Sequence, residues 1–573
     1  NQSINQSINQ SINQSINQSI NQSINQSINQ SINQSINQSI NQSNTQATWN
    51  SQKAPAAITS SRMGVPRYWL QSEQLTLREK EQDEVDPSTG LVGKRREPFV
   101  DSRNNFVYLS GVPVLYWPKF STSLERPTSY VSSVGISSDS VFGTQYLLDL
   151  DLLQLLGIQS AGKGLDWDLS LDYFTDRGFA FGTNLDYQVS GFLGSENQAN
   201  GLLDAWFIRD GGLDTLGNLR RDLIPETRNR GRVLLRHQQS IGSTGELTAE
   251  LGWVSDRNFL EQYLESEWDQ DTDHRSEVHL RRYHHSHLLD LTVGGRLNDF
   301  YTVTEKLPQL DHYLLGGSLL GERLTLSSHS KVGYQRLNRA DTPKNPAEAA
   351  LYSPVPGEIT ADGIVASTRQ EISLPFQAGP IRILPSLSGE AAHYGQDSLG
   401  EPVTRLLGQA GVSASLSAWK VDPSIQSALL NVRGLAHKLE WIAGYQYAES
   451  NLNLEDLPLY DPLDDNSQEQ FRSRYITTNF GGALDPRFDP RYHALRQGFQ
   501  WLVASPSDVI ADDLQRFRFG LHQRWQTKRG LPGKERIVDL LQFDIDTSLF
   551  PKADRDNFSE TIGPTTYSLL YHV

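Results

Sequence analysis

The chain has 573 residues, no cysteine and a formal net charge of -16 at pH 7. The lack of cysteine excludes disulfides and thiolate metal sites, and the acidic balance argues against a nucleic-acid partner, because phosphate binding needs a basic surface. A helical membrane span is also excluded, since the most apolar stretch, 146–158, is interrupted by Asp149, Asp151 and Gln154. Yet 11 Trp, 21 Tyr and 21 Phe in so polar a chain are typical of a membrane β-barrel, where only alternate residues face lipid.

Residues 1–43 repeat the tetrapeptide Asn-Gln-Ser-Ile. The period is too short for a solenoid and too polar to bury a core, so we interpret residues 1–62 as a disordered or filler repeat with a linker. No basic and apolar leader precedes the repeat, and we expect that a signal peptide was removed or never included.

Residues 63–118 contain short β-rich runs around a charged loop at 78–96. We interpret them as the last strands of a small β-domain. The domain ends in GVPVLYWPKF (111–120), which must be a connector or an edge strand, because proline withholds a ladder hydrogen bond from a central strand. This interpretation assigns residues 119–573 to a second domain.

The clearest strand signal lies at 165–189, where apolar and polar residues alternate on both sides of a turn at 175–178. Similar amphipathic runs recur to the end of the chain, which predicts an all-β fold with a large antiparallel outer-membrane barrel. Aspartates on the polar faces are expected to line the lumen: Asp149, Asp151, Asp166, Asp168, Asp172 and Asp186. Long polar stretches such as 449–474 are predicted to be extracellular loops.

Several segments, in order, resemble one family. PRYWLQSEQLTL (66–77) and RREPFVDSRNNFVYLS (95–110) precede GVPVLYWP, and RGRVLLRHQQ (230–239), GWVSDRNFLEQY (252–263), TEKLPQL (304–310), the run at 372–394 and HKLEWIAGYQY (437–447) follow. They resemble the lipopolysaccharide-assembly outer-membrane protein family LptD, also called the organic solvent tolerance family. The resemblance extends from about residue 63 to the C-terminus, and it implies a periplasmic β-jellyroll, here only its C-terminal part, followed by the barrel.

The resemblance implies a function without covalent chemistry or cofactor. Lipopolysaccharide would pass from a periplasmic bridge along an apolar slot in the β-domain and enter the outer leaflet through a lateral gate between the first and last barrel strands. Candidates for the slot are Tyr68, Leu70, Leu75, Leu77, Val107 and Leu109, which would equally pack an ordinary small β-core. Candidates for the gate are Pro113, Tyr116, Pro118 and Pro127, because proline removes inter-strand donors, although linker prolines would look the same.

The family also implies partners: lipopolysaccharide, outer-membrane lipid, a plug lipoprotein similar to LptE and a bridge protein similar to LptA. The chain departs from the family in three ways. It cannot form the family's disulfides, it lacks a further proline in the strand after Pro127, and it ends without a terminal aromatic residue. From the last departure we expect missing strands and an open sheet edge.

Other classes of function remain as alternatives. A passive porin or solute channel would need neither a β-domain nor a lateral seam, and a soluble glycan-binding β-sandwich would purify without detergent. An enzyme is not expected: His284, His285 and His287 have no cysteine or placeable carboxylate beside them, and GxSxG, HExxH and Walker motifs are absent. The paired aspartates could mimic a glycosidase or calcium site, but a solvated lumen face explains them more simply.

Overall fold

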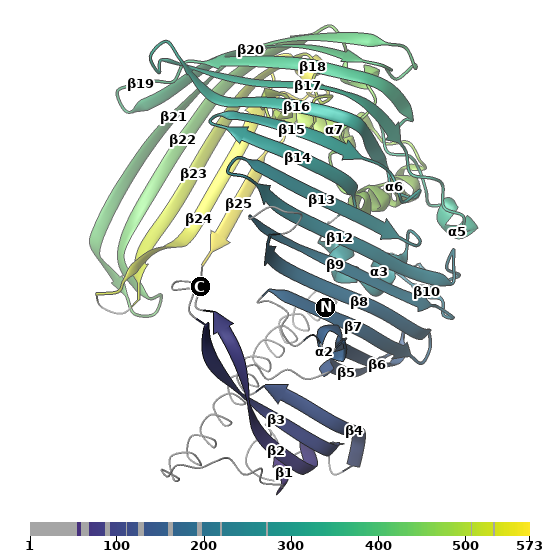
Figure 1. Cartoon of the computed structure of the whole chain (residues 1–573). Coiled ribbons are helices and arrows are strands. Elements are labelled where there is room, and N and C mark those ends of the chain that lie inside the picture. The colour runs from purple at the N-terminus through teal and green to yellow at the C-terminus, as the bar shows by residue number, and fades with distance from the viewer. Residues whose placement is uncertain are drawn as a thin grey trace. The chain divides into compact units, whose positions relative to one another are not determined.

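The computed structural model describes residues 54–58, 68–85, 92–109, 112–123, 131–156, 158, 164–191, 197–217, 220–270, 273–505, 507–530 and 533–572 (Figure 1). The chain divides into two compact units, residues 1–134 with 148–159 and residues 135–147 with 160–573. The tetrapeptide repeat lies outside the described residues. No described helix is both long and apolar enough to cross a membrane.

A four-stranded antiparallel sheet belongs to the first unit. Its order is β1 (Ala54–Ile58), β2 (Tyr68–Val85), β3 (Val92–Leu109) and β4 (Val112–Ser123). β1 lies within the segment interpreted as linker, and β4 continues past Pro118 to Ser123. β4 is at the edge of the sheet, and no described strand pairs with its outer side. On that side Pro113 and Pro118 therefore remove no inter-strand hydrogen bond.

Strand β3 changes its buried face midway. Ser102 and Asn105, three residues apart on β3, are both 2% exposed, although strict alternation would place them on opposite faces. Between them Asn104 has a φ of 50°, a left-handed conformation that reverses the alternation. Asn105, directly after Asn104, pairs with buried Ser72, whose Oγ donates to Asn105 Oδ1 at 2.6 Å. Ser102, two residues before Asn104, pairs with Leu75.

The other large sheet is a closed antiparallel barrel of 19 labelled strands, running from β5 to β9 and from β12 to β25 before returning to β5. The all-β prediction is confirmed. The expected open edge is wrong, because the strand order closes. The strands are β5 (Val131–Asp139), β6 (Gly143–Asp151), β7 (Leu165–Phe174), β8 (Gly178–Ser190), β9 (Gln198–Arg209), β12 (Asn229–Ile241), β13 (Gly245–Val254), β14 (Ser276–His284), β15 (His287–Gly294), β16 (Val303–Leu319), β17 (Leu324–Asn338), β18 (Ala361–Ser373), β19 (Phe376–Ala378), β20 (Ile381–Tyr394), β21 (Val403–Ser427), β22 (Val432–Ser450), β23 (Leu514–Arg529), β24 (Arg536–Leu549) and β25 (Thr566–Tyr571).

Two of these labels describe one strand. Ser373 of β18 pairs with Ser386 of β20, and Phe376 of β19 pairs with Ile383 of β20 in the same register. The interruption falls at 374–375, where Pro375 lacks the N–H that would continue the ladder. Counted as one, β18 and β19 leave an even number of strands in the wall.

The predicted hairpin at 165–189 forms as β7 and β8. Tyr173 pairs with Phe179 and Leu171 with Phe181, so the aromatic and apolar side chains share the outer face. Phe179 is 61% and Phe181 57% exposed there. Asp172 lies on the inner face, where its carboxylate is buried and accepts from the indole Nε1–H of Trp206 at 2.9 Å.

The long connections gather at one end of the barrel, which also carries the short turns 140–142 and 175–177, while the other short turns lie at the opposite end. The short turns 242–244, 285–286, 320–323 and 428–431 alternate along the chain with long connections that carry their own elements. These are β10 (Asp214–Thr215), β11 (Arg221–Leu223), α3 (Phe259–Tyr263), α4 (Glu265–Asp269), α5 (Pro346–Ala349) and α8 (Ala553–Asp556), with the β22–β23 connection treated below; α2 (Leu152–Leu155) follows β6.

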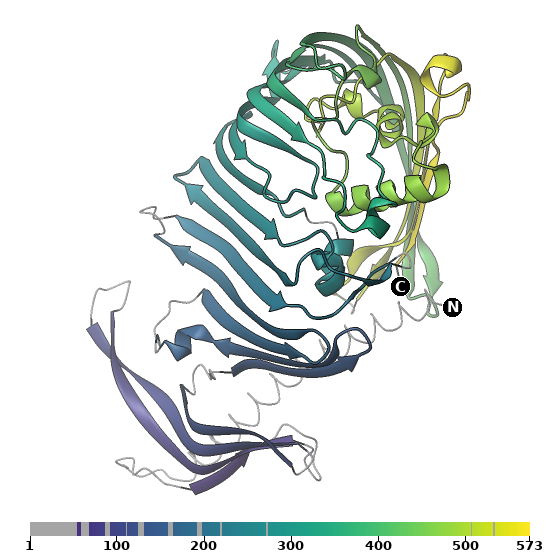
Figure 2. The same cartoon turned by 90° about the vertical axis from the view of Figure 1, so that its right-hand side faces the viewer.

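The longest connection, 451–513, folds inward. It contains η2 (Leu454–Asp456), α6 (Asn466–Phe480), η3 (Pro486–Phe488), α7 (Pro490–Gln497) and η4 (Phe499–Trp501). Its Leu454, Tyr460 and Leu495 pack with Leu337 of β17 and Tyr394 of β20 in the largest buried apolar cluster of the described chain. Figure 2 shows its yellow-green helices within the curve of the strands. This segment, which we call the inserted segment, contains most of the predicted loop 449–474.

Candidate functional site: the inner wall of the barrel

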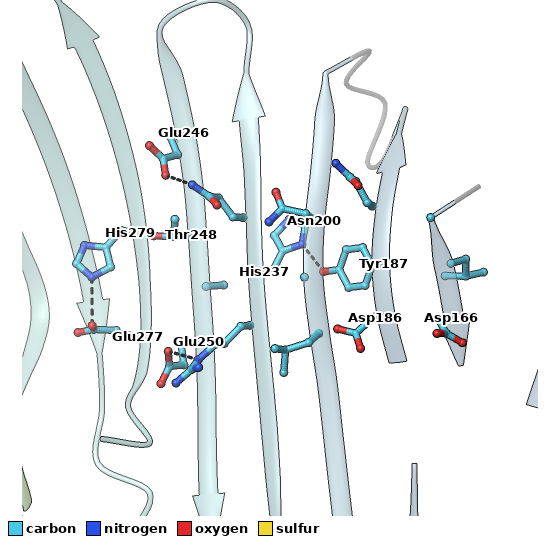
Figure 3. Close-up of a pocket in the computed structure, with 18 of the residues that line it drawn as sticks. Asp166, Asp186, Tyr187, Asn200, His237, Glu246, Thr248, Glu250, Glu277 and His279 are labelled. Carbon is cyan, nitrogen blue, oxygen red and sulfur yellow. Dashed lines mark hydrogen bonds and ion pairs between the residues drawn. The ribbon is translucent and has the colours of Figure 1, made fainter. Parts of the chain in front are cut away.

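The inner faces of β7, β8, β9, β12, β13 and β14 line an open groove of about 960 Å³ (Figure 3). Strand register builds it row by row. One row joins Asp166, Asp186, Leu202, Arg236, Glu250 and Glu277 across successive strands. The next inward-facing row contributes Gln188, Asn200, Gln238, Thr248 and His279. Alternation of polar inner and apolar outer residues therefore produces a continuous wet surface.

Carboxylates outnumber cations on this surface. Arg236 Nε lies 3.0 Å from Glu250 Oε2, and His279 lies 3.3 Å from Glu277 and 3.1 Å from Asp290. Asp166 and Asp186 face each other across β7 and β8, and neither has an ion-pair partner within the described residues. Such a surface suits hydrated polar solutes, and it repels anions that lack counterions.

The opposite part of the inner wall is covered by the inserted segment. Lys331 Nζ on β17 lies 2.7 Å from Asp508 Oδ2 and 3.6 Å from Asp461 Oδ2, both in that segment. The Arg369 guanidinium donates to the Gln500 carbonyl, and Arg405 donates to the Asp508 and Val509 carbonyls. Lys331 and Arg369 lie near the middle of their strands, so the segment reaches deep into the barrel.

A buried charge cluster ties the long connections together at β12. Arg230 is 1% exposed, and its guanidinium contacts Asp210 at 3.1 Å, Asp256 at 2.9 Å and also Asp214. Burial raises the pKa of Asp214 to about 6, although Arg230 opposes the shift. Burial acts on Asp210 in the same sense, but the Gly212 N–H, the Tyr263 hydroxyl, Arg177 and Arg230 outweigh it and lower its pKa.

The six aspartates that were predicted to line the lumen lie in different surroundings. Asp166 and Asp186 line the groove, and Asp172 lies on the same inner face but is buried under Trp206. Asp168 pairs with Asn184 in the inward-facing set of β7 and β8. Asp149 accepts from Ser133 Oγ, while Asp151 caps α2 by accepting from the Gln154 N–H at 2.9 Å.

The predicted slot residues lie on β2 and β3. Tyr68 pairs with Leu109, Leu70 with Val107, Leu75 with Ser102 and Leu77 with Val100. Strict alternation would divide the six candidates between two faces. Their role as an apolar slot stays a prediction.

The predicted gate residues do not lie in one element. Pro113, Tyr116 and Pro118 lie on β4, are exposed, and belong to the four-stranded sheet, whereas Pro127 lies outside the described residues. The Tyr116 hydroxyl donates to Asn104 Oδ1 at 2.8 Å, so Tyr116 braces the residue at which the buried face changes. Their role as a gate stays a prediction.

Three functional features were missed from sequence: the inserted segment, the Arg230 cluster and the cation–carboxylate contacts of Lys331. The available signal was the length of the connection 451–513 and the unusual lysine and arginines on inward-facing strand positions. Within the described residues, no cluster of three His, Asp or Glu side chains is arranged to hold a metal ion.

The class defined by this geometry is a large β-barrel with a partly filled polar lumen, combined in one chain with a separate small β-sheet. No protein-family model matches the chain. Two curated proteins named LPS-assembly protein LptD, from Xanthomonas oryzae pv. oryzae strains MAFF 311018 and KACC10331 / KXO85, are each 26% identical to it over 183 residues. The aligned stretch covers 31% of this chain and 18% of each relative, less than a fifth of the relatives' length.

Solved outer-membrane proteins also align with the chain. OmpT of Vibrio cholerae covers 71% of this chain and 92% of its own, with a TM-score of 0.22 and 10% identity. OprD from Pseudomonas aeruginosa covers 72% and 97%, with a TM-score of 0.23 and 10% identity. The barrel assignment rests on the strand order of the chain itself.

Proposed function

We propose that this chain is an outer-membrane translocon that receives lipopolysaccharide from a periplasmic bridge and inserts it into the outer leaflet. The observation that carries the proposal is the combination of the four-stranded sheet and a closed barrel in one chain that is similar to LPS-assembly proteins. A channel for small solutes has no use for the sheet.

The barrel supports an outer-membrane location. It has an even number of strands once β18 and β19 are joined, an exposed apolar outer face, and long connections gathered at one end with only shorter connections between strands at the other. In outer-membrane barrels the short turns are periplasmic and the long loops extracellular. On this assignment the four-stranded sheet, which precedes β5, belongs to the periplasmic side.

The proposed path uses both units without covalent chemistry. Acyl chains would contact the slot candidates of β2 and β3, which are Tyr68, Leu70, Leu75, Leu77, Val107 and Leu109. The saccharide would use the polar lumen, and the acyl chains would leave between β25 and β5. Pro113, Tyr116, Pro118 and Pro127 remain the candidates for this gate. A bridge protein similar to LptA would deliver the glycolipid, and a lipoprotein similar to LptE would contact the part of the lumen that the inserted segment leaves open.

Site-specific photocrosslinking in cells tests the path. Probes at the slot candidates Leu70 and Leu109 are expected to give lipopolysaccharide adducts, whereas a probe at exposed Gln71, next to Leu70 in the chain, serves as the matched control. A probe at Pro118 reports on the gate. Equal labelling at Leu70 and Gln71, or no adduct at Leu70 and Leu109 in a correctly inserted barrel, contradicts the proposal.

A passive channel is the second candidate, and the open groove along β7–β14 favours it. Planar-bilayer recording separates the two functions. A steady cation-selective conductance, unchanged when lipopolysaccharide export is blocked, would support the channel, because the groove carries excess carboxylates.

A further inference from the structure

One side of the inserted segment carries a row of aromatic side chains. Phe471 and Tyr475 lie on α6, Phe480 ends that helix, and Phe488 ends η3. Successive ring centroids are 6.2, 5.9 and 5.8 Å apart. Phe471 is 46%, Tyr475 49% and Phe488 62% exposed. We call these four residues the aromatic ladder.

The ladder is not the side that holds α6 in place. Ile476 is 1% exposed, and Ser473 Oγ donates to the Ser353 carbonyl at 2.5 Å, so the helix is anchored through other residues. The α6 N-terminus is fixed by Asn466, whose N–H donates to Asp273 at 2.8 Å. Four neighbouring aromatic rings outside that anchored side form an apolar surface of the kind that marks a binding site.

Two arginines without carboxylate partners adjoin the ladder. Arg487 precedes Phe488 and donates to the Phe558 carbonyl, and Arg496 donates to the Arg487 and Tyr492 carbonyls and to Asn557 Oδ1. All these acceptors are neutral, and neither guanidinium lies within ion-pair distance of a carboxylate in the described part of the chain. Burial and the neighbouring Arg487 both lower the pKa of Arg496, which indicates that the two cations repel each other.

We propose that the aromatic ladder and the Arg487–Arg496 pair bind a saccharide chain that carries phosphate or carboxylate groups. This rests on the proposed function and deepens it, because it names the part of the cargo that the inserted segment would contact. Flat aromatic faces provide apolar contact for sugar rings while leaving their hydroxyls solvated. The planar guanidinium forks match phosphate and carboxylate oxygens. A protein partner would instead have to bring carboxylates against both arginines.

Binding is measured by isothermal titration on the full chain in detergent, with the phosphorylated oligosaccharide released from lipopolysaccharide by removal of lipid A. Phe471→Ala and Tyr475→Ala are each expected to weaken binding roughly fivefold, the size of one aromatic contact. Arg487→Gln with Arg496→Gln is expected to weaken it by roughly tenfold or more, as for lost charge-assisted hydrogen bonds. The dephosphorylated oligosaccharide should bind the wild type and the arginine variant equally.

Matched controls lie elsewhere in the barrel. Phe179→Ala removes an equally exposed ring from the outer face, and Arg433→Gln removes an arginine that already faces Glu535 at 3.4 Å. Both controls should bind as the wild type does. A phosphorylated polysaccharide without any link to lipopolysaccharide tests the other source of the same chemistry, and tighter binding of that polymer would assign the site to it.

Equal binding by the wild type and the ladder variants overturns the inference, as does a co-purifying protein that the same variants release. The outcome is separable from the proposed function. If depletion of the chain leaves lipopolysaccharide assembly normal while the variants still lose saccharide binding, the translocon proposal fails and the saccharide site stands. If depletion blocks assembly while the variants bind normally, the saccharide site fails alone.

Discussion

Two regions of the barrel wall share the alternating strand pattern but differ in how far their inward-facing charges are exposed to solvent. Along β7–β14 the inward-facing charges remain partly solvated: the side chains of Arg236 and Glu250 are 37% and 24% exposed. Along β17–β21 the inward-facing charges are covered, and the side chains of Lys331 and Asp508 are 5% and 12% exposed. An inward-facing strand position therefore carries a polar or charged side chain in both regions. The connection 451–513 decides whether water or protein atoms supply the hydrogen-bond and ion-pair partners of that side chain.

The largest effect is expected from Arg230→Ala, which leaves Asp210, Asp214 and Asp256 without their common cation. Removing one partner of a buried ion cluster lowers the free energy of unfolding by about 3–5 kcal/mol. Arg236→Ala, on the same strand but in the groove, should cost no more than about 1 kcal/mol. Urea unfolding in lipid vesicles, followed by Trp fluorescence, measures both. Similar losses for the two variants would contradict the distinction between the buried and the solvated half.

Lys331→Met should release the inserted segment, because Asp508 and Asp461 lose their shared cation while the apolar stem is kept. We expect a cost of about 3 kcal/mol, concentrated in the docking of the segment. Limited proteolysis followed by mass spectrometry should show new cleavage within 451–513. Arg336→Met is the control, because exposed Arg336 lies on the same strand and faces Glu305 at 3.4 Å, outside the inserted segment, and it should leave the cleavage pattern unchanged.

Docking of the inserted segment should also depend on pH. Burial raises the pKa of Glu469 on α6 from 4.5 to about 7, and within the described residues its Oε2 has no hydrogen-bond partner. Because the folded pKa exceeds the unfolded one, the stabilisation is complete below pH 4.5 and is lost as the pH rises through 7. Cleavage within 451–513 should therefore increase between pH 5 and pH 8.

Glu469→Gln tests that assignment, since an amide cannot titrate. It should flatten this pH dependence by on the order of 2 kcal/mol across the range. Asp214, with its pKa raised to about 6, titrates in the same direction, so a smaller slope should persist in the variant. A slope identical to that of the wild type would show that Glu469 is not the group responsible.

The smallest effect is expected in the groove. Asp166 and Asp186 are directly opposite on β7 and β8, and like charges in that arrangement destabilise a strand pair. Asp186→Asn should raise the unfolding free energy by about 0.5 kcal/mol at low salt, and by less at high salt as screening removes the repulsion. Asp172→Asn is the contrasting variant, because it weakens the bond from Trp206 and should destabilise.

The barrel strands could be predicted from sequence because apolar and polar residues alternate within each strand. The alternation at 165–189 predicted the turn between β7 and β8 and the shared faces that include Tyr173, Phe179 and Phe181. The inserted segment carries no such local signal. Leu454, Tyr460 and Leu495 are buried by Leu337 and Tyr394, which are distant in the chain, so their burial depends on tertiary packing.

The four-stranded sheet shows the same limit on a smaller scale. The candidate residues Leu70 and Leu75 are an odd number of positions apart, which a regular strand would send to opposite faces. On β3 the buried Ser102 and Asn105 are also an odd number of positions apart, and Asn104 between them has a left-handed backbone, which asparagine adopts more readily than most residues other than glycine. Its identity alone did not distinguish such a switch from an ordinary polar strand residue.

The inserted segment is joined covalently at both ends to the wall it covers, through β22 and β23. Its return after any excursion is therefore an intramolecular event, governed by a high effective concentration rather than by the supply of a separate subunit. Contacts worth only a few kcal/mol are then enough to keep it docked most of the time, and yet permit frequent openings. A cargo that competes for those contacts would need no external energy source to move it aside.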